Sequence, residues 1–206
     1  MKFKLLIFSF FLIVFQSVVV SQSASDYLKK LQNKFETVKD FKADYSGSLY
    51  SKNGGIIAKF DGKLFYKKSK KIKIITKRRT IISNGNSLWT FDKKLNRVVI
   101  TNPKDNPNPV SIETYLYDYA KLCNVENLNE KKSGMSGIRL SANSKKIKFD
   151  YADIWFTNDY VVKQIELVKR NTRYSVELSK VKLNQDLKNS EFDFKILKGM
   201  KVVDLR

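Results

Sequence analysis

The chain has 206 residues and a formal net charge of +20, with 42% hydrophobic and 29% charged residues. This length and hydrophobic content allow one globular domain with a sizeable core. The charged fraction excludes a membrane-embedded bundle as well as a disordered chain. There is no histidine, and the only cysteine is Cys123, so an intramolecular disulfide is excluded and we interpret Cys123 as a buried packing residue.

Residues 1–23 are predicted to form a signal peptide. Two lysines precede the apolar stretch Leu5–Val20, and serines occupy the small-residue positions of a cleavage site before Ala24. The apolar stretch is shorter than the roughly 20 residues that a membrane-spanning helix needs, although an uncleaved anchor is the alternative interpretation. We therefore expect an exported protein in which residues 24–206 form a single domain.

The positive charge is mostly lysine and is spread along the whole chain. Removal of the leader leaves a net charge of +18, because the leader carries two lysines and no acidic residue. We interpret the excess as a compositional bias of solvent-exposed faces, with a functional patch for an anionic surface as the alternative. Export argues against nucleic acid as a partner.

The segment Ser25–Val38 is predicted to be an amphipathic helix capped by Ser25, because its apolar residues recur at helical spacing. The pattern then changes to the two-residue alternation of β-strands. One strand precedes the turn signal Asn53–Gly55, and a second follows it over 56–67. Gly62 lies on the apolar face of this second strand, where it indicates a bend or a bulge.

Short strands are expected around Ile72 and Ile74 and from Thr80 to Ile100, a stretch that includes the "SLWTF" piece with Trp89. The loop Pro103–Pro109 cannot continue a central strand, and the following "SIETYLYDYAKL" of Ser111–Leu122 predicts a second amphipathic helix. Further strands are expected at Gly137–Ser141, Ile147–Thr157, Val161–Lys169, Arg173–Leu183 and, as a short last strand, near Phe192–Ile196.

These elements predict a mainly β (α+β) fold. A long antiparallel meander has to curl, because open sheets twist and leave unpaired edges. We expect a half-open barrel whose apolar concave face is covered by the two helices. Such a trough holds either side chains alone or an apolar ligand, and the pattern leaves both interpretations open.

Three segments resemble the periplasmic outer-membrane lipoprotein carriers of the LolA type. They are "GKLFYKKSKKIKI" at Gly62–Ile74, "ISNGNSLWTFDKKLNRVVI" at Ile82–Ile100 and "FDFKILKGMKVVDLR" at Phe192–Arg206. In that family, a "G-x-L-W-x-K-R-P" strand is followed by a "DG-x-x-LW-x-Y" hairpin, and an "F-x-F-x-P-x-x-G" element lies near the end. The order of helix, strands, lid helix and strands also agrees, so the resemblance covers essentially the whole mature chain.

The resemblance implies a monomeric periplasmic carrier without cofactor or metal. Its cargo would be an acylated lipoprotein, received from an ATP-driven inner-membrane transporter and given to an outer-membrane acceptor, and basic residues would allow transient contact with a membrane surface. The residues expected to line the acyl-chain cavity are Phe60, Leu64, Tyr66, Ile72, Ile74 and Trp89 on the sheet and Ile112, Tyr115, Leu116 and Tyr119 on the lid. Ordinary core packing is the alternative for each.

The sequence departs from the family pattern at the position associated with closing the lid. The family's arginine aligns with Lys68, which cannot reproduce a bidentate guanidinium fork. We therefore expect a weaker latch or one that is made differently. A phenylalanine and a tryptophan of the family align with Ile72 and Ile74, which keep the apolar character without the rings.

An enzyme is not expected, because the chain lacks histidine, a metal-ligand cluster and a phosphate-binding loop. Asp150 and Asp153 are close in sequence, but on a strand they would point to opposite faces. The remaining alternatives are a regulatory sensor related to anti-sigma regulators, a carrier of another lipid or glycolipid, and a barrel filled by its own side chains.

Overall fold

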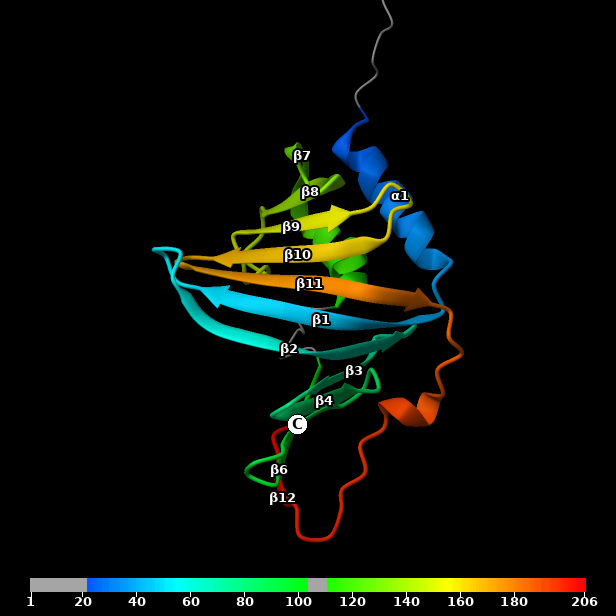
Figure 1. Ribbon diagram of the computed structural model, residues 1–206, viewed down its shortest axis with the longest axis vertical. Helices are drawn as coiled ribbons and strands as arrows, with labels where there is room; N and C mark the ends of the chain where they lie inside the picture. The colour runs from blue at the N-terminus through cyan, green and yellow to red at the C-terminus, as the bar shows by residue number, and fades with distance from the viewer. Residues whose placement is uncertain (1–21, 104–110) are drawn as a thin grey trace, which may run out of the picture.

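The computed structural model describes residues 22–103 and 111–206. Residues 1–21 of the expected signal peptide and most of the loop Pro103–Pro109 therefore lie outside the described residues. The elements along the chain are α1 (Ala24–Glu36), β1 (Asp40–Tyr50), β2 (Ile56–Lys67), β3 (Lys71–Thr76), β4 (Arg79–Ser83), β5 (Leu88–Asp92), β6 (Arg97–Thr101), η1 (Thr114–Tyr119), η2 (Ala120–Leu122), β7 (Cys123–Lys132), β8 (Met135–Ala142), β9 (Tyr151–Phe156), β10 (Val162–Lys169), β11 (Thr172–Leu183), η3 (Asn189–Phe192) and β12 (Lys201–Asp204) (Figure 1).

All twelve strands lie in one sheet, in the order β12-β6-β5-β4-β3-β2-β1-β11-β10-β9-β8-β7. Neighbouring strands are antiparallel, except that β12 pairs parallel with β6. The mainly β fold predicted from the alternating pattern is confirmed. Within the described residues, no helix is long and apolar enough to cross a membrane.

The first helix begins one residue earlier than expected and ends at Glu36. Its N-cap is Ser23 rather than Ser25, because the Ser23 hydroxyl accepts a hydrogen bond from the Asp26 N–H while the Asp26 carboxylate accepts from the Ser23 N–H. The apolar stripe of the helix carries Leu31 and Phe35, which are buried against the sheet. Cleavage before Ala24 would therefore remove the residue that caps this helix.

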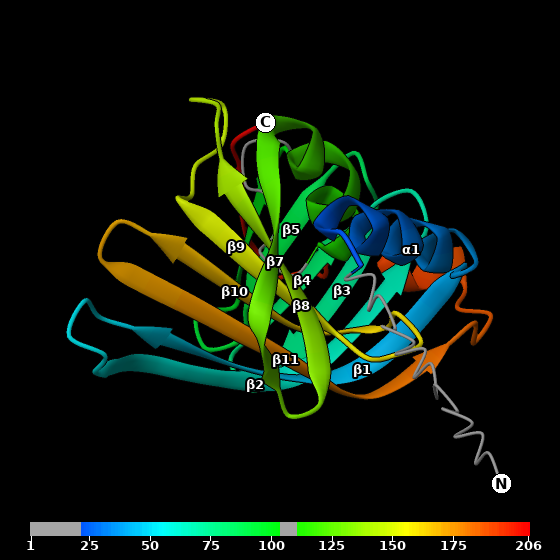
Figure 2. The same ribbon diagram turned by 90° about the horizontal axis from the view of Figure 1, so that it is seen from above.

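One face of the sheet, which we call the inner face, carries the main core. It is the face on which Leu64, Ile74, Ile138 and Val176 lie, each exposing 3% or less of its surface. Together with the apolar side of α1 and the segment 112–122, these residues form one continuous cluster. Figure 2 shows α1 and this segment lying over the sheet.

The second helical segment is present but is not a regular α-helix. After a short start at Ile112 it forms a π-helix over Thr114–Tyr119 and a 3₁₀ turn over Ala120–Leu122. Isolated π-helical turns are uncommon and are frequently found at functional sites. We call the whole segment 112–122 the lid.

Two strand predictions need correction, and the strands β7 and β12 were not predicted. The strand expected at Ile147–Thr157 begins only at Tyr151. The strand expected near Phe192–Ile196 is absent, because a short 3₁₀ turn ends at Phe192. The last strand along the chain is β12. Strand β7 was not predicted, because its sequence "CNVENLNEKK" is mostly polar. Strand β7 lies at one edge of the sheet, so it is paired on one side only.

The glycine on β2 does not form a bulge. The pairing of Gly62 with Tyr45 on one side and with Thr76 on the other continues without a register shift at this point. A side chain here would place its Cβ 2.2 Å from the Ile75 carbonyl oxygen. Gly62 is therefore required by a close approach between neighbouring strands.

Candidate functional site

Four of the predicted sheet residues come together under the lid. Leu64 pairs directly with Ile74, and Tyr66 pairs with Ile72, so all four side chains lie on the inner face of β2 and β3. Each exposes 5% or less of its surface. Phe60 lies further along β2, is half-buried, and stacks on Tyr174 of β11 with ring centroids 5.0 Å apart.

Trp89 lies on the other side of the sheet, so its predicted place beside these residues is wrong. It pairs with Ile82, and Ile82 pairs with Lys73, whose neighbours Ile72 and Ile74 point to the opposite face. On this outer face, the segment between β11 and β12 covers the strands. Phe194 of that segment contacts Phe91 with ring centroids 5.6 Å apart, and its Phe192 is fully buried.

The four predicted lid residues face the sheet. Ile112, Tyr115 and Leu116 expose 5% or less of their surface, and Tyr119 is half-buried. Tyr115 and Tyr119 form an edge-to-face pair at 5.3 Å, and Tyr119 makes a second one with Phe149 at 5.2 Å. The inner face and the lid thus enclose a continuous apolar and aromatic interior.

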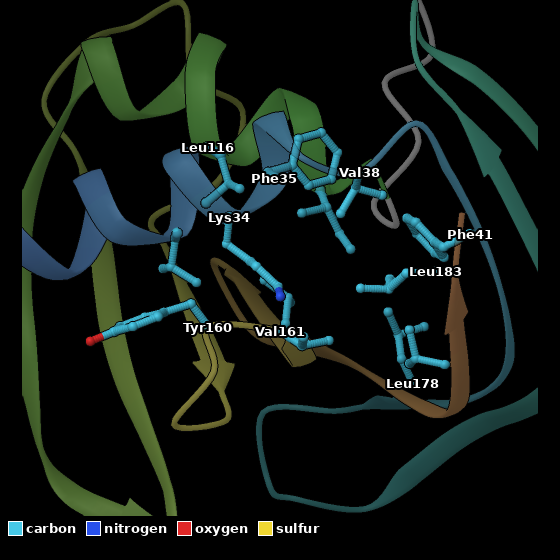
Figure 3. A pocket seen from close by; sticks show the side chains of 13 residues that line it. Lys34, Phe35, Val38, Phe41, Leu116, Tyr160, Val161, Leu178 and Leu183 are labelled. Carbon is cyan, nitrogen blue, oxygen red and sulfur yellow. The ribbon is translucent and has the colours of Figure 1, made fainter. Parts of the chain in front are cut away.

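The apolar cavity beneath the lid is small. The apolar cavity between α1, the lid and the ends of β1, β10 and β11 has a volume of only about 30 Å³, which is room for roughly one water molecule. Leu116 and Ile112 contribute to its lining, and the half-buried Lys34 extends across it (Figure 3). An acyl chain cannot enter unless the lid or the helix moves.

Polar contacts hold the lid to the sheet. The Tyr66 hydroxyl donates to Glu113 Oε2 at 2.8 Å, and the Lys70 N–H donates to the same oxygen at 3.2 Å. Lys70 Nζ also forms an ion pair with Asp118 Oδ2 at 2.9 Å. The turn that carries Lys70 has left-handed backbone conformations at both Ser69 and Lys70, and such conformations are costly for residues other than glycine.

A second set of contacts holds the lid to α1. Gln32 Nε2 donates to the Leu116 carbonyl at 2.7 Å, and the Tyr117 hydroxyl donates to the Gln32 carbonyl at 3.1 Å and to Glu36 Oε1 at 2.8 Å. None of these polar residues was predicted. The spacing of apolar residues indicates which face of a helix or strand is buried, but it does not indicate which polar groups form hydrogen bonds with one another.

Lys68, the predicted latch position, contacts α1 and not the lid. Its Nζ donates to the Glu36 carbonyl at 2.8 Å and pairs with Glu36 Oε2 at 3.2 Å. Because Glu36 also accepts from Tyr117, Lys68 acts on the lid only through that carboxylate. Among the described residues, Lys68 therefore makes its side-chain hydrogen bonds and its ion pair with Glu36 alone.

The protonation states of these contacts follow from their surroundings. Burial, followed by the Glu113 carboxylate, raises the pKa of Tyr66, so Tyr66 stays a protonated donor. The hydrogen bond from Tyr117 and the neighbouring Lys68 lower the pKa of Glu36 below its usual 4.5, which keeps this carboxylate charged at neutral pH.

The described residues offer no arrangement typical of a catalytic or metal site. No group of three or more His, Cys, Asp or Glu side chains in this part of the chain could hold a metal ion. Asp153 accepts two hydrogen bonds from Arg139, at 2.6 and 2.8 Å, whereas Asp150 accepts from the Arg170 N–H. Burial raises the pKa of the Cys123 thiol, which keeps it protonated and unreactive.

Comparison with known proteins gives a consistent result over most of the chain. Residues 36–195 match the family model described as outer membrane lipoprotein carrier protein LolA. The outer-membrane lipoprotein carrier protein of Francisella tularensis (strain WY96-3418) is 25% identical over 194 residues, covering 90% of this chain and 91% of that protein. The protein of the same name from Pasteurella multocida is 23% identical over 189 residues, with the same coverage.

Two solved structures share the fold at low sequence identity. An uncharacterized conserved protein from Thermus thermophilus aligns with a TM-score of 0.59 and 8% identity, over 88% of this chain and 99% of that one. The lipoprotein LppX of Mycobacterium tuberculosis aligns with a TM-score of 0.50 and 10% identity, over 82% and 98%.

Proposed function

Because the chain belongs to the family of the outer membrane lipoprotein carrier protein LolA, we propose that it carries acylated lipoproteins through the periplasm between the inner and the outer membrane. Membership of this carrier family confirms the expectation that the protein is not an enzyme. The observation that supports the cargo is the apolar inner face, which is closed by a lid held through polar contacts.

The physical need for such a carrier follows from the cost of exposing acyl chains. Each CH₂ group exposed to water costs about 0.8 kcal/mol, so a lipoprotein with several chains does not diffuse freely through an aqueous compartment. We propose that the sheet acts as a half-open barrel whose inner face replaces water around these chains. Phe60, Leu64, Tyr66, Ile72 and Ile74 would line it on the sheet side.

Loading then requires the lid to move, since the cavity beneath the closed lid has a volume of only about 30 Å³. The lid's Ile112, Tyr115, Leu116 and Tyr119 would leave the sheet and the acyl chains would take their place. The apolar area exposed by opening is covered again by the cargo, so the closed and loaded states can have similar free energies. The polar contacts at Glu113, Asp118 and Tyr117 exchange protein partners for water when the lid opens, so part of their free energy is recovered.

The partners proposed here follow from that cycle. An ATP-driven inner-membrane transporter would supply the lipoprotein, and an outer-membrane acceptor would remove it. Export through the N-terminal signal peptide would place the chain in the periplasm, where it would act as a monomer without a cofactor.

The experiment that tests the function measures release of lipoprotein from a membrane. The processed protein is mixed with inner-membrane vesicles that hold a triacylated lipoprotein and its export transporter, and soluble lipoprotein is measured with and without ATP. The proposal predicts ATP-dependent release in a one-to-one complex, and no release of a non-acylated control. Failure to release lipoprotein, with a positive-control carrier working in parallel, would contradict the proposal, and binding of free lipid alone would favour a non-protein cargo.

A matched pair of positions tests where the acyl chains bind. A photo-crosslinking residue at Ile74 faces the inner side, whereas the same residue at Trp89 faces the outer side. We expect crosslinks to the acyl chains of the cargo from position 74 and none from position 89. Equal crosslinking from both positions would contradict an inner-face site.

A further inference from the structure

Three connections of the sheet meet at one end of the molecule. They are residues 50–59 at the β1–β2 hairpin, 143–150 before β9, and 169–173 at the β10–β11 hairpin, and we call them together the hairpin rim. Tyr50 pairs with Arg173, and the Asp150 N–H donates to the Val168 carbonyl at 2.8 Å, so the three are neighbours in space. Figures 1 and 2 both show the β1–β2 and β10–β11 hairpins projecting side by side.

The hairpin rim is strongly cationic. It contains eight lysine and arginine residues and one carboxylate, Asp150. All eight basic residues are exposed: Lys52, Lys59, Lys145, Lys146, Lys148, Lys169, Arg170 and Arg173. Among the described residues, only Arg173 of these forms an ion pair, with Glu166. The other seven positive charges therefore project toward solvent from one end of the sheet.

Two large apolar side chains stand at the tip of this cationic surface. Ile56 and Ile57 are 51% and 56% exposed, directly after the turn that is closed by the Ser51 N–H donating to the Gly55 carbonyl at 2.8 Å. The other exposed large hydrophobic residues of the described chain are Leu95 and five residues of the C-terminal segment: Ile196, Leu197, Val202, Val203 and Leu205. More than half of Ile56 and of Ile57 is therefore open to solvent beside the basic residues of the rim.

We propose that the hairpin rim is a docking surface for an anionic lipid bilayer, with Ile56 and Ile57 entering the interfacial layer and the surrounding lysines and arginines contacting phosphate head groups. Clustered basic side chains next to exposed apolar ones bind such surfaces through charge attraction and apolar burial together. A bilayer fits better than a folded acidic protein, because the charges are spread over three separate loops around a protruding tip. A fluid layer of head groups can adapt to that shape.

The rim also touches the lid. Phe149, in the connection before β9, packs edge-on against Tyr119 and lies 6.2 Å from the Tyr115 ring. Docking at the rim would therefore bring the bilayer near the element that must move during loading. The docking surface itself does not depend on the cargo proposed above.

The test is sedimentation of the processed protein with lipid vesicles. We expect binding to vesicles that contain phosphatidylglycerol, roughly tenfold or more weaker binding to pure phosphatidylcholine vesicles, and a progressive loss of binding as the salt concentration rises, because ions screen exposed charges. No binding to the anionic vesicles at low salt would overturn the proposal. So would equal binding to both vesicle types.

A matched pair of serine substitutions locates the contact. Ile57→Ser should weaken binding to anionic vesicles roughly tenfold, whereas Leu197→Ser, at a 61% exposed leucine of the C-terminal segment, should leave it unchanged. Both positions are at the surface, so neither variant is expected to unfold. Equal loss in the two variants would overturn the assignment to the hairpin tip.

Charge and depth are tested separately. The double variant Lys145→Glu and Lys146→Glu should abolish most of the salt-sensitive binding. The emission that an Ile57→Trp variant adds to that of the parent protein, which has two tryptophans, should be blue-shifted on anionic vesicles and quenched by brominated lipid. An unshifted emission would contradict insertion of the tip.

Lipoprotein release from vesicles is also measured on the Ile57→Ser variant. Normal release together with weak vesicle binding would leave the carrier function intact, so failure of either proposal can be recognised.

Discussion

Two segments cover the same face of the sheet, and they are built differently. The helix α1 is regular, has a reciprocal N-terminal cap, and places Leu31 and Phe35 in the core. The lid has a π-helical and a 3₁₀ turn, no side-chain cap at either turn, and polar contacts to α1 and to the β2–β3 turn. Both segments bury apolar side chains. Only the lid combines an irregular backbone with several polar contacts whose groups could bind water instead.

This difference indicates which segment can move. Displacing α1 would expose Leu31, Phe35 and the core residues beneath them. Opening the lid would also expose apolar side chains, and it would break hydrogen bonds and one exposed ion pair, whose groups water can satisfy. We therefore treat α1 as a permanent part of the wall and the lid as the gate, and the predictions below test that division from the largest expected effect to the smallest.

The largest effect is expected from truncating the core of α1. Leu31→Ala removes a side chain that is only 1% exposed, and such substitutions cost about 2–5 kcal/mol in the free energy of unfolding. The measurement is urea denaturation followed by circular dichroism.

The matching substitution in the lid is Leu116→Ala, at a side chain that is fully buried. If the lid opens while the rest of the protein stays folded, Leu116→Ala can lower the free energy of unfolding by no more than the free energy of lid opening. The loss should therefore be smaller than that caused by Leu31→Ala. Amide hydrogen exchange in residues 112–122 should become faster while that of β2 stays unchanged. An equal global loss in both variants would show that the two segments unfold as one.

A smaller effect is expected from removing the donor to the lid carboxylate. Tyr66→Phe deletes the hydrogen bond to Glu113, and hydrogen bonds to charged groups contribute about 1.5–3 kcal/mol. Lid amides should exchange between roughly tenfold and a hundredfold faster. Tyr45→Phe is the control, because Tyr45 lies on the same face without a lid partner among the described residues; comparable acceleration by the control would argue against a specific contact.

The link through Glu36 should depend on pH. Its pKa in the folded protein is lowered from 4.5 by the Tyr117 and Lys68 contacts, so the stabilisation is fully present above about pH 4.5 and is lost as the pH falls through the lowered value. Lid opening, followed by exchange in residues 112–122, should accelerate only below that range. Glu36→Gln should remove this transition; a transition that persists in the variant would assign it to another carboxylate.

The smallest effect is expected at Lys68. Its side chain and that of Glu36 are 44% and 62% exposed, and exposed pairs contribute at most about 1 kcal/mol. Lys68→Arg should leave lid opening within roughly twofold of the wild type, because the partner lies on α1 and not on the lid. A much slower opening in this variant would mean that an arginine can still reach the lid directly.

The strongly periodic parts of the sequence predicted the fold well. The stripe of Ser25–Val38 located α1 to within two residues at either end, and the alternation in 41–66 located the first hairpin. Strand β7 escaped because an edge strand needs few apolar residues, and Val125 and Leu128 stand among polar neighbours. The last predicted strand failed because Phe192 and Phe194 anchor an irregular segment to the outer face instead of alternating within a strand.

The site was predicted only in its apolar part. Alternation groups residues of one strand by face, but it does not say which face is inside when both are apolar. Trp89 and Leu88 illustrate this, since the first lies on the outer face and the second on the inner face. The polar contacts of Tyr66 with Glu113 and of Gln32 with the Leu116 carbonyl join residues 47 and 84 positions apart, and no local pattern predicts such pairs.

The most direct test of the account is to fix the lid to the sheet and measure loading. Cysteines in place of Lys70 and Asp118, whose side chains form an ion pair, are joined by a cleavable bis-maleimide reagent in a Cys123→Ser background. The account predicts that the joined protein takes up no acylated lipoprotein and that cleaving the reagent restores uptake. Normal loading of the joined protein would contradict the assignment of residues 112–122 as the gate.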